Sequence, residues 1–148
     1  MPKSITFLIL AVFLILSGKP SHAQENTKAI YALIDNYSMA RENRDTVLLK
    51  NILTEDIDQL VSTGEWRYGL QAAVKGMMES SAASPGTRTL RVEKVRFLDK
   101  HTALADARYE IRNPDGSVRS MWSSFTVVMR HKTWKISAIR NMLPAANK

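Results

Sequence analysis

One hairpin constrains the fold of this chain most, because its register can be read from the sequence. Residues 103–112 alternate apolar and polar side chains, and the Asn-Pro-Asp-Gly segment 113–116 suits a type I turn closed by a left-handed glycine. That loop pairs Asn113 with Ser117 and fixes the register beyond it. Four pairs then lie opposite one another: Tyr109 and Met121, Ala107 and Ser123, Ala105 and Phe125, and Ala103 and Val127. The odd-numbered face is apolar along both strands, which supports this register.

A bent strand is expected before the hairpin, and a further strand, 134–142, after a tight turn at 131–133. In segment 87–98 the apolar side chains are Leu90, Val92, Val95 and Phe97. Their parity flips in the middle, so we predict a β-bulge near Glu93 and Lys94 that bends the strand sharply.

Three helices precede or interrupt these strands. The first, from Thr27 to about Asn43, carries one stripe of mainly apolar residues: Ile30, Leu33, Ile34, Tyr37 and the pair Ala40/Arg41. A short second helix is expected from Asp45 to Asp56, followed by a strand at 57–63 and a turn or short hairpin at 65–68. A third helix begins near Leu70 and ends before 84–86. The sequence therefore predicts an α+β fold, with helices packed on one face of a strongly curved antiparallel sheet.

The first 23 residues read as a cleavable secretion signal. Lys3 precedes the apolar run 5–16, and Ser21-His22-Ala23 offers the small residues of a cleavage site. The run is too short to span a bilayer, which takes about 20 residues. We expect residues 24–148 to be one periplasmic or secreted domain, with no membrane attachment after cleavage. The chain has no cysteine, so packing alone must hold that domain.

The order of several short motifs resembles the nuclear-transport-factor-2-like (NTF2-like) superfamily, in the group of SnoaL-like proteins and ketosteroid isomerases. The motifs are Tyr37 to Asp45, the segment 53–56, Gly64, the helix led by Gly69, and the strand segments 125–130 and 134–136. The resemblance covers Ala29 to Pro144 and implies a cone-shaped α+β fold that is often dimeric. It also implies a pocket between helices and sheet.

The resemblance argues against isomerase chemistry. Isomerases of this kind use an aspartate base together with a tyrosine and a protonated aspartic acid. Matching the motifs places the tyrosine at Tyr37 but puts the other two positions on Val61 and Val127. Valine can neither accept nor donate a proton. Asp56 is the best remaining carboxylate, although a capping or pairing role at the junction of helix and strand suits it better.

The expected pocket is mainly apolar, with a few polar-tipped side chains. Its residues are Tyr37, Val61, Trp66, Tyr109, Ser123, Phe125, Val127, Met129 and Asn141. Tyr37 and Tyr109 fit equally well as core residues with satisfied hydroxyls. Strand alternation lets only one of Arg140 and Asn141 face inward, and family spacing favours Asn141. The alanine run 103–107 leaves room either for close packing of a helix or for a cavity.

The sequence indicates no cofactor and no metal site, because His101 and His131 fall in turns without ligands at metal-binding spacing. The chain carries a net charge of +7, but its basic residues form no stripe of the kind that binds nucleic acid. We therefore expect a non-catalytic domain that binds a small apolar ligand or serves as an accessory protein. One alternative is an isomerase, cyclase or dehydratase acting on a small hydrophobic substrate. Another is a protein-interaction module that forms a homodimer through the sheet face bearing Trp122 and Val128.

Overall fold

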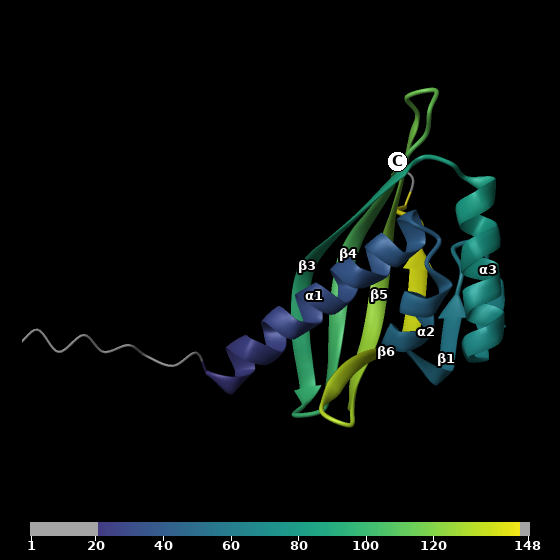
Figure 1. The fold of residues 1–148 in the computed structure, drawn as a ribbon. Helices are drawn as coiled ribbons and strands as arrows, with labels where there is room; N and C mark the ends of the chain where they lie inside the picture. The colour runs from purple at the N-terminus through teal and green to yellow at the C-terminus, as the bar shows by residue number, and fades with distance from the viewer. Residues whose placement is uncertain (1–20, 146–148) are drawn as a thin grey trace, which may run out of the picture.

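The computed structural model describes residues 21–145. The predicted signal run 5–16 and residues 146–148 lie outside the described residues. The elements run in chain order as α1 (His22–Glu42), α2 (Thr46–Ile52), β1 (Leu53–Leu60), β2 (Trp66–Tyr68), α3 (Gly69–Ala83), β3 (Thr87–Asp99), β4 (Thr102–Arg112), β5 (Val118–Arg130) and β6 (Thr133–Met142). The predicted α+β class and curved sheet are confirmed: α1 crosses one face of the sheet and α3 lies beside β1 (Figure 1).

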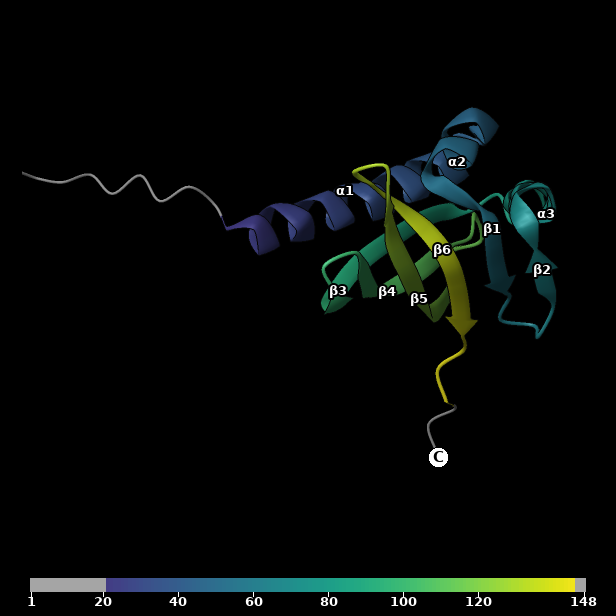
Figure 2. The same ribbon diagram turned by 90° about the horizontal axis from the view of Figure 1, so that it is seen from below.

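The sheet has six strands in the order β2-β1-β6-β5-β4-β3. Every pair is antiparallel except β1 and β6, which run parallel, so the fully antiparallel sheet expected from the sequence is corrected at this one pair. The pairing joins the first strand of the chain to the last. Viewed from below, the sheet curves from β3 round to β2, and α1 and α2 lie along one side of it (Figure 2).

The register of the β4–β5 hairpin is confirmed. Tyr109 pairs with Met121 and Ala105 with Phe125, and the Asn113 backbone N–H donates to the Ser117 carbonyl at 2.9 Å. The predicted bulge is also present, since the β3–β4 register shifts between 92 and 94. A tight turn joins β5 to β6 as expected.

That turn consists of two residues, His131 and Lys132, between the paired residues Arg130 and Thr133. Both turn residues have a positive φ, 49° and 64° respectively, as a type I′ hairpin turn requires. Left-handed backbone is unfavourable for residues other than glycine, asparagine and aspartate, so this turn stores conformational strain.

Two helix boundaries differ from those predicted. Helix α1 begins at His22 rather than Thr27, because Ser21 caps it by accepting a hydrogen bond from the Gln24 backbone N–H at 3.3 Å. Its first turns are exposed and carry no apolar stripe, which hid them from the periodicity argument. Helix α2 ends at Ile52, and Asp56 lies exposed within β1 rather than at the end of a helix.

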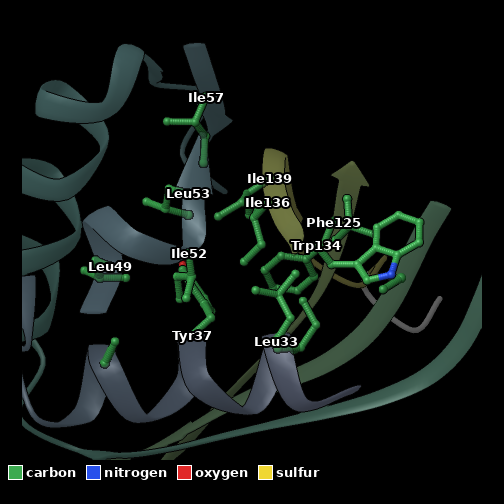
Figure 3. Close-up of a cluster of buried hydrophobic side chains, with 14 of the residues drawn as sticks. Leu33, Tyr37, Leu49, Ile52, Leu53, Ile57, Phe125, Trp134, Ile136 and Ile139 are labelled. Atoms are coloured by element: carbon green, nitrogen blue, oxygen red, sulfur yellow. The ribbon is translucent and has the colours of Figure 1, made fainter. Parts of the chain in front are cut away.

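The core fills the space between α1, α2, α3 and the sheet (Figure 3). Tyr37 from α1 meets Phe125 from β5 edge-to-face, with ring centroids 5.4 Å apart. Ala103, Ala105 and Ala107 are fully buried in the same cluster. The alanines therefore face packed side chains of the core rather than an empty space.

Candidate functional site

A cavity of about 200 Å³ lies at the end of the fold where the β4–β5 hairpin, the last turn of α1 and the β1–β2 loop meet. We call it the mouth cavity. Its lining comes from every layer of the fold: Arg41, Gln59, Val61, Ser62, Thr63, Glu65, Arg67, Ser80, Tyr109, Ile111, Arg119, Met121 and Asn141. More than half of these side chains are polar or charged, so the apolar lining expected from the sequence is not what the fold provides.

Arg41 is the buried cation of the mouth cavity. Only 4% of the residue is exposed. Its Nη1 donates to the Tyr37 hydroxyl at 2.8 Å and its Nε donates to Ser81 Oγ at 3.1 Å. Within residues 21–145 it makes no ion pair with a carboxylate. A buried charge without a counter-charge is costly, and a fold retains one where it has a use.

The environment keeps Tyr37 neutral and Arg41 charged. Burial raises the pKa of Tyr37, and the nearby Arg41 charge offsets this only in part. Burial opposes the charged form of Arg41, but the Tyr37 and Tyr109 hydroxyl groups outweigh it and raise the Arg41 pKa above its ordinary value. The phenol is therefore an acceptor for a permanent guanidinium cation.

Arg67 reaches the mouth cavity from β2 across helix α3. Its Nε lies 2.7 Å from Glu65 Oε1, and its Nη1 donates to Gln59 Oε1 at 3.4 Å. The guanidinium occupies the space beside Gly76, where a Cβ would lie 2.4 Å from Arg67 Cζ. Glycine at 76 thus makes room for Arg67. The hydrogen bond from Arg67 lowers the pKa of the Glu65 carboxyl group, so Glu65 is an ion-pair partner and a poor base.

The rim adds a third cation and an apolar wall. Arg119 Nη2 donates to Ser62 Oγ at 2.7 Å. Val61, Ile111 and Met121 supply apolar surface on the lining. The cavity can therefore present positive charge to one part of a ligand and hydrocarbon to another.

Five of the residues predicted for the pocket lie in or next to this cavity. Val61, Tyr109 and Asn141 line it. The Ser123 hydroxyl donates to Asn141 Oδ1 at 2.7 Å and orients that amide. Tyr37 does not line the cavity but holds Arg41 in place from below. Within residues 21–145 the Tyr109 hydroxyl makes no hydrogen bond, which leaves it free for a ligand.

The other predicted pocket and catalytic residues lie elsewhere. Phe125 and Val127 are fully buried in the solid core, and Met129 packs against the same cluster. The inward direction of these side chains was predicted correctly, but packed neighbours fill the space they face. Trp66 is 44% exposed on the edge strand, and Asp56 is exposed on β1, so neither borders the mouth cavity.

Asn141 lines the cavity, whereas its neighbour Arg140 points to the outer sheet face. There Arg140 Nη1 pairs with Asp58 Oδ1 at 2.7 Å, and the guanidinium lies 4.8 Å from the centroid of the Trp66 ring. Strand alternation explains the opposite directions of residues 140 and 141. The three arginines of the cavity were missed by the sequence analysis. The sequence could have indicated that Arg41 is buried, because this residue falls on the buried stripe of α1 four residues after Tyr37.

Comparisons at the level of sequence find no matching protein-family profile and no matching curated protein. Solved structures do match. An NTF2-like protein of unknown function from Shewanella oneidensis aligns with a TM-score of 0.68 at 15% identity, covering 79% of this chain and 98% of that one. The chain has the NTF2-like fold. The fold implied by the sequence motifs is thereby confirmed.

Two further solved structures align with this chain, one a candidate enzyme and the other a domain of unknown function. A candidate scytalone dehydratase from Novosphingobium aromaticivorans aligns with a TM-score of 0.68 at 15% identity, covering 81% of this chain and 85% of that one. A protein with a cystatin-like fold from Nostoc punctiforme aligns with a TM-score of 0.73 at 16% identity, covering 86% and 81%. Identities this low show the fold alone.

Two further properties concern metals and membranes. Among residues 21–145 no group of three or more histidine or acidic side chains is arranged to hold a metal ion. In the same part of the chain no helix combines the length and the apolar character needed to cross a membrane. His101 and His131 are exposed in the turns where the sequence places them.

Proposed function

We propose that this protein is an exported, non-catalytic domain that binds a small molecule in the mouth cavity. The observation that carries the proposal is Arg41, a cation held in a fixed orientation by Tyr37 and Ser81 beside a cavity that opens to solvent. Preorganised polar groups next to an apolar wall are the usual composition of a small-ligand site. The polar lining supports a ligand with one charged or polar end rather than the wholly apolar ligand expected from the sequence.

The chemistry of the lining favours binding over turnover. The only carboxylate that lines the mouth cavity among residues 21–145 is Glu65, and its ion pair with Arg67 lowers its pKa. A general base needs a pKa near the working pH. Val61 cannot serve as one. The alternative of an enzyme acting on a small hydrophobic substrate draws on the candidate scytalone dehydratase that shares the fold. It requires a general base, and the lowered pKa of Glu65 makes that carboxylate a poor one.

The binding proposal is tested with the chain that begins at Gln24. Native mass spectrometry of the purified domain should detect a small molecule that is released on denaturation. Val61→Trp, which fills the cavity from its half-buried rim, should abolish that signal, and Val118→Trp on the exposed outer hairpin should keep it. Retention of the molecule in both variants would refute the proposed site.

Export through cleavage after Ala23 is part of the proposal and rests on the signal pattern of the first 23 residues. Helix α1 tolerates that cut well, because its first fully buried residue is Ile30. Asn26 also remains to accept a hydrogen bond from Trp134 Nε1 at 3.3 Å. Mass spectrometry of protein from a periplasmic extract should give Gln24 as the first residue. An intact N-terminus on protein from the cytoplasm would contradict export.

We also propose that the domain forms a homodimer through the outer sheet face. Trp122 and Val128 are half-buried on that face, and the Arg108 guanidinium lies 3.8 Å from the centroid of the Trp122 ring. Sedimentation of the domain should give a dimer that Trp122→Asp dissociates. Met39→Asp, a comparable change on the exposed side of α1, should leave the dimer intact. A monomeric parent protein would refute this assignment.

A further inference from the structure

The mouth cavity carries more positive charge than its own residues balance. Three arginines line it, at positions 41, 67 and 119, against one glutamate, Glu65. Glu65 is already engaged by Arg67, and among residues 21–145 the exposed Arg119 is bound only by the neutral Ser62 hydroxyl. The lining therefore has a net excess of two positive charges around a cavity that opens to solvent. An anion from outside would supply the counter-charge that the buried Arg41 lacks.

Arg41 supplies an open donor at the base of this space. Two of its three nitrogens are used, by Tyr37 and Ser81, and both bonds hold the guanidinium plane in place. Within residues 21–145 the third nitrogen, Nη2, makes no hydrogen bond and is not sealed off by protein. A guanidinium fixed in this way binds a planar carboxylate with little further loss of side-chain freedom.

The size and the wall of the cavity limit the rest of the ligand. A volume of about 200 Å³ equals roughly seven water molecules at about 30 Å³ each, so only a small ligand fits inside it. Val61, Ile111 and Met121 form an apolar surface that an inorganic ion would leave uncovered. The free Tyr109 hydroxyl offers one further polar contact.

We infer that the ligand of the mouth cavity is a small organic carboxylate with a short apolar body, held by Arg41 with Arg67 and Arg119. This rests on the proposed binding function and names the ligand class for the same site. Benzoate matches the class in size and charge, and benzamide is its neutral counterpart of nearly equal shape.

Isothermal titration calorimetry at pH 7 on the chain that begins at Gln24, after removal of any co-purified molecule, tests the inference. Benzoate should bind at one site per chain, and benzamide should bind at least tenfold more weakly because it lacks the charge that pairs with guanidinium. Arg67→Gln and Arg119→Gln should each weaken benzoate binding about fivefold to tenfold. Arg91→Gln, the same charge change on the exposed surface of β3, should not alter it. These variants avoid the buried Arg41, whose substitution puts folding at risk.

Each contrary outcome overturns the carboxylate assignment. Equal affinity for benzamide would mean that the site ignores charge, and binding of inorganic phosphate in place of benzoate would mean a different anion. An equal loss in Arg91→Gln would mean that long-range attraction, and not the cavity, holds the ligand. If benzoate fails to bind while Val61→Trp still displaces a co-purified molecule, the inference fails and the proposed binding function stands.

Discussion

Gly76 has two effects: it weakens α3, because it lies in the middle of that helix, and it leaves space for the neighbouring Arg67. Replacing Gly76 by alanine should separate these two effects. The new Cβ would lie 2.4 Å from both Cζ and Nε of Arg67. Carbon atoms in contact sit about 3.5–4.0 Å apart, so the guanidinium must move by at least about 1 Å. It can move, because it lies at the end of a flexible side chain. The backbone of α3 need not shift.

The expected stability change follows from two opposing effects. Alanine in place of glycine inside a helix stabilises by about 1 kcal/mol. Moving Arg67 weakens its pair with the largely exposed Glu65, and ion pairs of exposed groups add little stability. The Gly76→Ala protein should therefore gain clearly less stability over its parent than the full amount of about 1 kcal/mol. Its affinity for benzoate should nevertheless fall about tenfold, because one of the three cations leaves its position.

A double-mutant cycle in urea, followed by circular dichroism, measures the coupling. With Arg67→Ala already present, Gly76→Ala should show its full gain of about 1 kcal/mol, or about 3 °C in melting temperature. The same stability gain in both backgrounds would show that Arg67 does not occupy the space beside Gly76. A loss of more than about 2 kcal/mol in both backgrounds would place backbone rather than a side chain there.

Two further predictions concern stability alone. Tyr37→Phe should cost about 1–3 kcal/mol at pH 7, because it removes an acceptor from buried Arg41. Burial raises the Tyr37 pKa above its ordinary 10.0, so the stability from the neutral phenol is complete below pH 10 and is lost as the pH rises through the raised pKa. The free energy of unfolding, measured in urea from pH 8 to 11, should therefore fall less steeply for Tyr37→Phe than for the parent. Parallel pH profiles for the two proteins would contradict this. Replacing His131 and Lys132 together by Asn-Gly should raise the free energy of unfolding by about 1–2 kcal/mol, because both positions have left-handed backbone. An unchanged melting temperature would mean that the turn is unstrained.

The sheet was predictable from the sequence where a local rule fixes geometry. The turn at 113–116 sets the register of the whole β4–β5 hairpin, and the parity flip around Glu93 locates the bulge. Both signals depend on neighbours along the chain. The parallel pairing of β1 with β6 depends on strands about eighty residues apart and left no comparable trace in the sequence.

The cavity was harder to predict for the same reason. The alternation of apolar and polar residues predicted that the Phe125 and Val127 side chains point inward. It could not predict whether those side chains meet packed neighbours or an empty cavity. Arg67 enters the lining from a strand of only three residues, too short for a periodic signal. The position of the Arg67 side chain depends on the space beside Gly76. In the sequence alone, Gly76 is an ordinary helix glycine with no visible link to Arg67.

The place of β6 in the sheet has a consequence for how the protein is made. Strands β1 and β2 are linked to β3, β4 and β5 only through β6, which comes last in the chain. A growing polypeptide that lacks residues 133–142 holds two fragments of sheet with no strand to join them. Cooperative folding of the sheet must therefore wait until residues 133–142 have been synthesised.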